Sequence, residues 1–355
     1  MRYLTPAGLA ADLAVRDLTD PGQGPHALQL LVRDILSAVT ARWPGAALTI
    51  HRGDRVVDVA DNYDLLGYTP RAATRDSRYT RYVAEGRMLR SQTSALIPGA
   101  LREVTAAEAL IACPGIVYRR DAIDRLHTGT PHQLDLWRLT TGPAHLPELV
   151  AVVLAAALPG VPWRSRPAGH PYTTDGLELQ AKAAGEGGWV EVGECGVAAG
   201  HVLRRDGIAG LALGLGLDRV LMLRKGIDDI RLLRSTDPRV AAQMLDLTPY
   251  APVSAQPAAG RDLSVAAPGD VTAEDLGDRI RELLGADAHL VEEVGILSIT
   301  PPSALPEASR ARLGLRDDEV NVLLRVVLRD PHGALPKQRA NALRDRIWAG
   351  LMSSR

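Results

Sequence analysis

The chain has 355 residues, 46% of them hydrophobic, with a formal net charge of -1 and an isoelectric point near 6.8. This length exceeds one ordinary domain and this composition supplies a large core, so two domains are expected and a disordered or fibrous protein is excluded. The near-neutral charge gives no overall basic field, so any RNA-binding surface must be a local cluster of arginines. Phenylalanine is absent from the sequence.

The two cysteines, Cys113 and Cys195, stand without a Cys/His cluster at metal-ligand spacing. Neither a disulfide framework nor a structural zinc site is therefore predicted. The first twenty residues include acidic ones and lack a continuous apolar segment, so a secretory signal is not expected. The longest apolar stretch, residues 149–158, is too short to span a bilayer. These features predict a cytoplasmic protein without a membrane partner.

The first part of the chain mixes helices and strands. Residues 24–41 space apolar residues at helical intervals and predict a helix, whereas the alternating run 47–59 predicts a strand. Residues 100–111 predict a second helix. Strands are expected over 115–121 and 132–139, joined by a loop rich in turn formers. The remaining expected elements are a helix over 146–158, strands over 177–183 and 189–192, and a glycine-rich strand that continues into a helix over 211–224.

The composition changes at residues 249–260, PYAPVSAQPAAG, where proline, alanine and small polar residues are typical of a linker. We therefore predict a first domain over 1–248 and a second domain over 261–355. The second is expected to be a small α/β sandwich. Its predicted elements are a strand over 261–267, a helix over 273–284, strands over 290–299 and 320–328, and a helix over 337–351.

Polar groups concentrate in residues 115–137, GIVYRRDAIDRLHTGTPHQLDLW. Arg119 and Asp121 lie two apart in the first predicted strand, and His127 follows in the loop. Gln133 and Asp135 share one face of the return strand. A planar guanidinium can stabilise the charge that develops on phosphate oxygens when a carboxylate attacks the α-phosphate of ATP, and Arg119 is the candidate for that role. Taken alone, the same pattern also suits a solvated hairpin face with paired charges.

This stretch closely resembles motif 2 of phenylalanyl-tRNA synthetases, which has a YRRD-like strand, a loop histidine and an HQLEG-like return strand. Upstream, residues 90–94 (RSQTS) look like the family's RTHTS segment, and residues 62–66 (NYDLL) resemble its NFD-L segment. Downstream, residues 210–222 (GLALGLGLDRVLM) are similar to motif 3, and residues 226–231 (GIDDIR) continue the likeness. Four blocks in the family's order argue against chance.

The resemblance implies that ATP and Mg²⁺ are the cofactors. Arg119 and Arg219 are then the catalytic residues, and Arg219 contacts the γ-phosphate. The glycines at 210, 214 and 216 permit close backbone approach to a flat ligand. Alone, such a glycine-rich turn would be interpreted as ordinary backbone packing. The implied ATP-binding residues are Arg119, Asp121, His127, Gly216 and Arg219. The implied metal ligands are Glu178 and Glu191, which could equally be two exposed strand acids.

The resemblance also implies an amino-acid pocket, in which Gln133 and Asp135 hold the substrate ammonium. His170 and Tyr172 fall in the segment written FPFTEPS or NPYTEPS in the family, and Ala212 keeps the small residue of the pocket floor. The implied pocket residues are Gln92, Ser94, Gln133, Asp135, His170, Tyr172 and Ala212.

Several positions depart from the family pattern, and we expect them to gather around this pocket. Asp135 replaces Glu, which withdraws the carboxylate by one methylene, and Leu136 replaces Gly, which fills space next to it. Gln92 replaces His, Pro131 replaces Phe, and Leu213 replaces the Phe of GxAFG. Because polar groups in a pocket discriminate strongly between substrates, His170 and Gln92 indicate a side chain more polar than phenylalanine.

The C-terminal part looks like the ferredoxin-like anticodon-binding domain of single-chain, organellar-type phenylalanyl-tRNA synthetases. The likeness rests on residues 261–264 (RDLS), residues 290–294 (LVEEV) and the last helix. RNA-binding sheets commonly stack bases on aromatic residues, and only Trp348 is available here. A structural domain that reads no anticodon is therefore an equal alternative.

The resemblance implies an α+β fold, namely the antiparallel sheet of class II synthetases with flanking helices, followed by a ferredoxin-like sandwich. The expected function is ATP-dependent activation of an amino acid and its transfer to tRNA. An alternative is a stand-alone paralogue that activates another amino acid for a carrier protein or a small amine. A third is a non-catalytic, RNA-binding pseudo-synthetase. A monomer and a homodimer both remain open.

Overall fold

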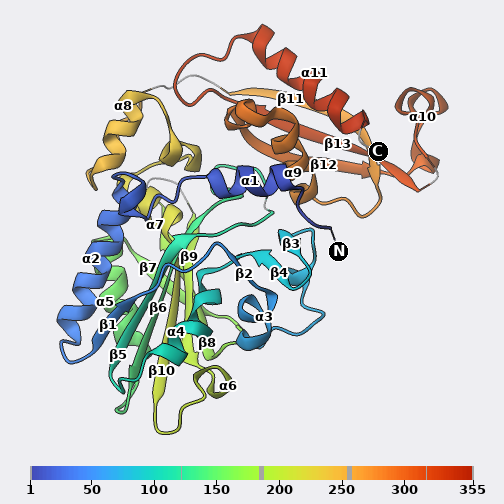
Figure 1. Ribbon diagram of the computed structural model, residues 1–355. Coiled ribbons are helices and arrows are strands. Elements are labelled where there is room, and N and C mark those ends of the chain that lie inside the picture. Colours follow the sequence, from blue (N-terminus) through green and yellow to red (C-terminus); the bar gives the residue numbers. More distant parts are fainter. Residues whose placement is uncertain (1, 121, 184–187, 254–257, 317, 354–355) are drawn as a thin grey trace. The chain divides into compact units, whose positions relative to one another are not determined.

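The computed structural model describes residues 2–120, 122–183, 188–253, 258–316 and 318–353 (Figure 1). They form two compact units. The first unit comprises Met1–Arg119, Thr130–Asp228 and Ala242–Tyr250, and the second comprises Arg120–Gly129, Asp229–Ala241 and Ala251–Arg355. The second unit thus takes in two segments that precede the predicted linker.

In the described residues, the first unit is built on a seven-stranded sheet with the order β1-β5-β6-β10-β9-β8-β7. Strand β1 pairs with β5 in parallel, and the other neighbouring strands are antiparallel. The strands are β1 Ala47–Ile50, β5 Ala109–Ile116, β6 His132–Thr140, β7 Trp163–Pro167, β8 Thr173–Lys182, β9 Trp189–Ala198 and β10 Ala209–Gly216. The expected α+β arrangement of a mainly antiparallel sheet with flanking helices is confirmed.

Two helices, α2 (Ala27–Arg42) and α5 (Leu146–Ala157), run along one face of this sheet (Figure 1). Helix α2 begins where His26 Nδ1 accepts a hydrogen bond from the backbone N–H of Leu28 at 3.2 Å. Its buried residues recur every three or four positions, so one apolar stripe faces the sheet. Helix α5 has a proline in its first turn, as expected.

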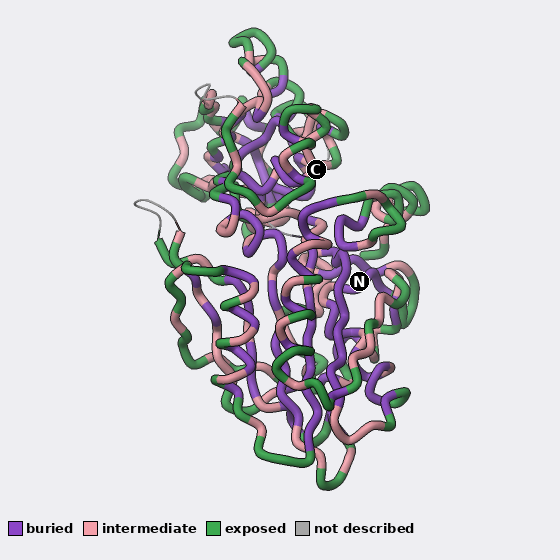
Figure 2. Tube along the Cα trace, turned by 90° about the vertical axis from the view of Figure 1, so that its left-hand side faces the viewer, coloured by how far each residue is buried: buried purple, intermediate pink, exposed green. Residues whose placement is uncertain are grey.

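The opposite face of the sheet carries a second core, formed with α4 (Ile97–Glu103) and α6 (Gly200–Leu203). Trp137 and Tyr172 lie in this core. Figure 2 shows the central strands as a buried layer with exposed residues at the turns and outer helix faces. The unit also contains α1 Pro6–Ala14, α3 Val59–Asn62, α7 Leu217–Lys225 and a small sheet of β2 Val56–Asp58, β4 Arg87–Leu89 and β3 Tyr82–Ala84.

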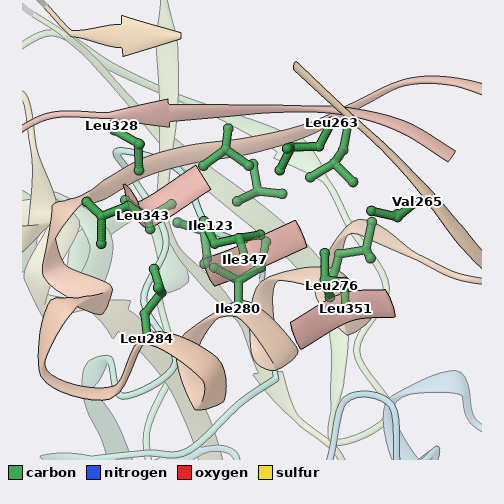
Figure 3. Close-up of a cluster of buried hydrophobic side chains, with 14 of the residues drawn as sticks. Ile123, Leu263, Val265, Leu276, Ile280, Leu284, Leu328, Leu343, Ile347 and Leu351 are labelled. Carbon is green, nitrogen blue, oxygen red and sulfur yellow. The ribbon is translucent and has the colours of Figure 1, made fainter. Parts of the chain in front are cut away.

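The second unit contains an antiparallel sheet with the order β11-β13-β12. Its elements are α8 Pro238–Ala241, β11 Ala259–Pro268, α9 Ala273–Leu284, β12 Val291–Thr300, α10 Glu307–Leu313, β13 Glu319–Leu328 and α11 Lys337–Ser353. A capping box between Thr272 and Asp275 starts α9. Leucine and isoleucine side chains of α9 and α11 pack against the strands, and Ile123, which is 7% exposed, joins this core (Figure 3).

The elements predicted beyond the linker are confirmed, and α9 has the predicted bounds. The helix predicted over 100–111 is wrong in its second half, because α4 ends at Glu103 and β5 begins at Ala109. All residues of β5 are buried, so the strand lacks the alternation that marks a half-exposed strand. Because β5 ends at Ile116, Arg119 lies beyond the strand, and its predicted place within the strand is also wrong.

Among the helices of the described residues, none has the length and apolar content needed to cross a lipid bilayer.

Candidate active site

Two arginine-bearing segments leave the same end of the seven-stranded sheet. Ile116, the last residue of β5, lies opposite His132 at the start of β6. Gly216, the last residue of β10, lies opposite Gln133. Arg119 follows β5 by three residues, and Arg219 lies in the first turn of α7, directly after β10. Since β5 and β10 flank β6, the register brings Arg119 and Arg219 to one edge of the sheet from its two neighbouring strands.

The segment Arg90–Ser94 holds three residues of the predicted site. Arg119 Nε donates a hydrogen bond to the carbonyl oxygen of Ser91 at 2.8 Å. The backbone N–H of Thr93 donates to Gln133 Oε1 at 3.2 Å, and the Ser94 hydroxyl donates to Asp135 Oδ2. A single short segment therefore fixes the arginine, the amide and the carboxylate relative to one another.

Arg90 anchors this segment from inside the protein. Its side chain is 2% exposed, and its Nε donates to the carbonyl oxygen of Ile116 at 2.8 Å. Burial lowers the pKa of Arg90, which the charge of Asp17 partly opposes. A Cβ added to Gly115 would lie 2.2 Å from Arg90 Nη2, so a larger residue at this position would displace the buried guanidinium.

Asp135 is a buried carboxyl group, 4% exposed. Besides the bond from Ser94, it accepts one from Trp137 Nε1 at 2.6 Å. Burial raises the pKa of Asp135 to about 6. The hydrogen bonds from Ser94 and Trp137 oppose this rise and the charge of Glu194 adds to it. A buried carboxylate of this kind gains most from a cationic ligand, which restores the interactions lost with water.

Aromatic side chains surround this carboxyl group. The ring centroid of Tyr172 lies 6.4 Å from that of Trp137, 6.0 Å from that of His170 and 6.4 Å from that of Tyr68. The Tyr68 hydroxyl donates to Gln92 Oε1 at 3.2 Å. The structure thus brings both unusual residues, Gln92 and His170, to the same aromatic cluster. Burial raises the pKa of Tyr68 to about 12, so its hydroxyl remains a donor at neutral pH.

The remaining pocket residues of the prediction lie in the same place. Ala212 is opposite Trp137 in the register and is 1% exposed. Tyr172 is 8% exposed and shares a core cluster with both of them. The seven residues predicted to bind the amino acid are therefore gathered on one face of the sheet, around Asp135.

Glu194 is a member of this cluster that the sequence patterns did not reveal. Its Oε2 lies 2.9 Å from His170 Nε2. Simple alternation along β9 places Glu191 and Glu194 on opposite faces. The register shifts between Leu179 and Gln180, where Gln180 pairs with Glu191, so a bulge turns both glutamates to one face. An isolated sequence offers no signal for such a bulge.

Glu178 and Glu191, the predicted metal ligands, lie on this face on adjacent strands. Glu178 is opposite Glu194, and Arg219 Nη1 lies 3.4 Å from Glu191 Oε2. The described residues contain no group of three His, Cys, Asp or Glu placed to hold a metal ion. Mg²⁺ commonly takes only one or two protein carboxylates and completes its shell with substrate phosphates and water. The two carboxylates therefore fit a magnesium ion that arrives with a nucleotide.

Two predicted ATP-binding residues do not belong to the described part of the first unit. Asp121 lies outside the described residues. His127 belongs to the second unit, where its Nδ1 lies 2.6 Å from Asp124 Oδ2. In the same segment, Arg120 forms a buried ion pair with Asp278 at 2.6 Å.

The glycines of β10 have different surroundings. A Cβ added to Gly210 would lie 2.9 Å from Ala198 Cβ and 2.9 Å from a methyl group of Leu203, so this glycine is required by packing and not by a ligand. At Gly214 and Gly216 the nearest atoms to an added Cβ are 3.8 Å away. These two glycines, in contrast to Gly210, leave open space on the face that carries Asp135.

Two departures from the family pattern do not line the pocket. Leu136 pairs with Leu213 across β6 and β10. Since neighbouring residues of a strand point to opposite faces, both leucines lie on the face away from Asp135. The interpretation that Leu136 fills space beside the carboxylate is therefore wrong. The pair instead packs within the other core, where both residues are buried.

A mainly antiparallel sheet is typical of the catalytic core of class II aminoacyl-tRNA synthetases when its central glycine-rich strand leads into an arginine-bearing helix and a second arginine follows a nearby strand. The chain matches the family "tRNA synthetases class II core domain (F)" over residues 25–244, and it belongs to this family. The resemblance to phenylalanyl-tRNA synthetases is confirmed by similarity to curated members.

Similar proteins include the phenylalanine–tRNA ligase alpha subunit of Prochlorococcus marinus (strain NATL2A), 32% identical over 206 residues, which are 56% of this chain and 61% of that protein. The alpha subunit of Acaryochloris marina is 31% identical over 254 residues, which are 68% of this chain and 75% of that protein. The chain thus spans about three fifths of the first relative's length. Among solved structures, the pyrrolysyl-tRNA synthetase of Desulfitobacterium hafniense is 18% identical with a TM-score of 0.44, covering 59% of this chain and 73% of that one.

Proposed function

We propose that the chain activates an amino acid with ATP, forms an aminoacyl-adenylate and transfers the aminoacyl group to tRNA. The observation that carries this proposal is the Arg90–Ser94 segment, which holds Arg119 and Asp135 through Ser91 and Ser94. In this reaction a carboxylate oxygen of the amino acid attacks the α-phosphorus of ATP. The bond to the β-phosphate bridging oxygen breaks, and pyrophosphate leaves with its electron pair.

The substrate ammonium is assigned to Asp135 and Gln133. Asp135 is ionised at neutral pH because its pKa is about 6, and a buried carboxylate attracts an ammonium strongly. Gln133 Oε1 accepts one bond from Thr93, which orients its amide and leaves a second lone pair for the ligand. Both groups lie on the face with open space at Gly214. Binding in this orientation directs the substrate carboxylate toward the edge of the sheet that carries Arg119.

The nucleotide is assigned to Arg119 and Arg219. Arg119, held at Ser91, is placed to stabilise charge on the α-phosphate as the new bond forms. Arg219 takes the other end of the triphosphate from the first turn of α7, where the helix dipole also favours an anion. Mg²⁺, when bound, neutralises phosphate charge, and Glu178 and Glu191 would hold it.

One feature of the second unit favours an acceptor other than tRNA. The sequences of β11, β12 and β13, all within the described residues, contain no aromatic residue. Trp348 lies on α11, where its Nε1 donates to the carbonyl oxygen of Ser264 at 3.0 Å. A sheet without aromatic residues is a poor platform for stacked bases. A carrier protein or a small amine is therefore the alternative acceptor, and the relatives' designation as alpha subunits adds a second subunit as a candidate partner.

ATP–pyrophosphate exchange across a panel of amino acids, with parallel charging of bulk tRNA, tests the proposal. Exchange with tRNA charging supports the full reaction. Exchange without charging supports the paralogue that serves another acceptor. A complete lack of exchange with every amino acid would refute activation and leave the non-catalytic pseudo-synthetase.

A further inference from the structure

Two carboxylates lie at the ends of one row across three strands. Asp135 of β6 is opposite Gly214 of β10, and Gly214 is opposite Glu194 of β9. Cross-strand partners project to the same face, and adjacent strands are about 4.8 Å apart, so the two Cα atoms are separated by roughly 10 Å. Gly214 has no side chain to fill the middle of this row. An added Cβ there would lie 3.8 Å from Asp135 Oδ2, so the open space reaches the buried carboxylate.

The Glu194 carboxylate is held through one of its two oxygens by His170. His170 Nε2 lies 2.9 Å from Glu194 Oε2, and the Thr173 hydroxyl lies 3.4 Å from His170 Nδ1. The histidine is thereby fixed between an oxygen on each side. The Glu194 side chain remains 42% exposed, and across the described residues its Oε1 has no hydrogen-bonding partner. One carboxylate oxygen is therefore directed to a ligand or to water.

The walls of this space are aromatic. Tyr172 and the half-buried Tyr68 have ring centroids 6.4 Å apart, and Tyr172 also stacks near Trp137. Aromatic faces attract cations, most strongly where water is excluded. An apolar ligand side chain in the same space would remove water from Glu194 without replacing its hydrogen bonds. The charge and the aromatic surroundings therefore both favour a cation.

We propose that this pocket selects an amino acid with a positively charged side chain. Asp135 holds the α-ammonium, and Glu194 Oε1 accepts a hydrogen bond from the side-chain cation. The inference rests on the proposed function for the placement of the α-ammonium. It makes Glu194 the residue that determines specificity.

Isosteric pairs of amino acids test the inference. Lysine is compared with 2-aminoheptanoic acid, in which a methyl group replaces the ammonium, and arginine with citrulline, by ATP–pyrophosphate exchange. The native protein is expected to favour at least one cationic member over its neutral partner by about tenfold in kcat/KM or more. Glu194→Gln keeps the shape but removes the charge, so the ratio should fall toward one. Glu85→Gln, at an exposed glutamate in the β3–β4 turn, is the matched control and should leave the ratio unchanged.

The outcomes separate this inference from the proposed function. Preference for phenylalanine, tyrosine or the neutral analogues would overturn the inference while supporting activation. Titration calorimetry of the same amino acids without ATP measures binding independently of chemistry. Binding of a cationic amino acid without exchange supports the pocket and refutes activation, whereas neither binding nor exchange refutes both. The comparison of cationic with neutral amino acids in the native protein tests the inference even if Glu194→Gln fails to fold.

Discussion

The Ser94 hydroxyl donates a hydrogen bond to Asp135 Oδ2, which joins the segment before α4 to the return strand β6. Trp137 Nε1 donates to the other carboxylate oxygen, so both oxygens are oriented by the protein before any substrate arrives. Such preorganisation reduces the cost of ordering the site when a ligand binds. Burial nevertheless remains the larger influence on this carboxyl group, and it raises the pKa of Asp135 to about 6.

Amino-acid binding is therefore expected to weaken in mild acid. Because the pKa of Asp135 is raised to about 6, the group takes up a proton below that pH and loses the charge that attracts the ammonium. The dissociation constant should rise by about tenfold for each pH unit below 6 and should level off above it. Calorimetric titrations between pH 5 and 8 measure this dependence. Asp135→Asn should bind weakly with no such transition, and a flat profile in the native protein contradicts the role of Asp135.

Removing the Arg119 guanidinium is expected to stop the chemical step without unfolding the protein. Arg119→Ala should lower the exchange rate constant by about 100- to 1000-fold, the usual effect of losing one preorganised donor to developing charge. Arg119→Lys should restore little, because an ammonium lacks the planar fork. Arg71→Ala, at an exposed arginine, is the control. Exchange within twofold of the native rate in Arg119→Ala would remove the assignment.

The magnesium requirement is expected to depend on Glu191. Its carboxylate lies 3.4 Å from Arg219 Nη1, so it contributes to both the metal and the phosphate side of the proposed site. Glu191→Gln should raise the Mg²⁺ concentration for half-maximal exchange by about tenfold or more. Glu85→Gln serves again as the matched control. An unchanged magnesium titration in Glu191→Gln argues that Glu191 is only an exposed strand acid.

The ion pair between Arg120 and Asp278 is expected to stabilise the second unit. Their side chains are 8% and 13% exposed, so Asp278→Ala leaves a charged guanidinium buried without this partner. The substitution should lower the free energy of unfolding of the second unit by about 3 kcal/mol. Hydrogen exchange at the amides of α9 and β13 measures it. Asp262→Ala breaks the exposed pair with Arg325 and should have a much smaller effect, because water screens that pair. Equal effects of the two substitutions contradict the prediction.

Much of the fold follows from the sequence because its periodicity is clear. The capped, amphipathic α9 has the predicted bounds, and the glycine-rich β10 continues directly into α7. The strand predicted over 115–121 begins too late, since β5 spans Ala109–Ile116. Burial on both faces of β5 erases the alternation of apolar and polar residues.

The candidate site was predicted in part. Gln92 and His170 were identified as departures, and they do lie around one aromatic cluster. Glu194 was missed because the bulge in β9 changes which face a residue occupies, and that change depends on pairing with β8. Leu136 was misplaced for a different reason, because alternation along β6 already puts this neighbour of Asp135 on the opposite face.

A crystal structure of the protein with ATP, Mg²⁺ and an amino acid is the most direct measurement. We expect one nucleotide with Arg119 at its α-phosphate and Arg219 at its γ-phosphate, each at a hydrogen-bonding distance of about 3 Å. The ammonium of the amino acid should lie against Asp135. A nucleotide reached by only one of the two arginines, or bound away from this edge of the sheet, contradicts the proposed adenylation.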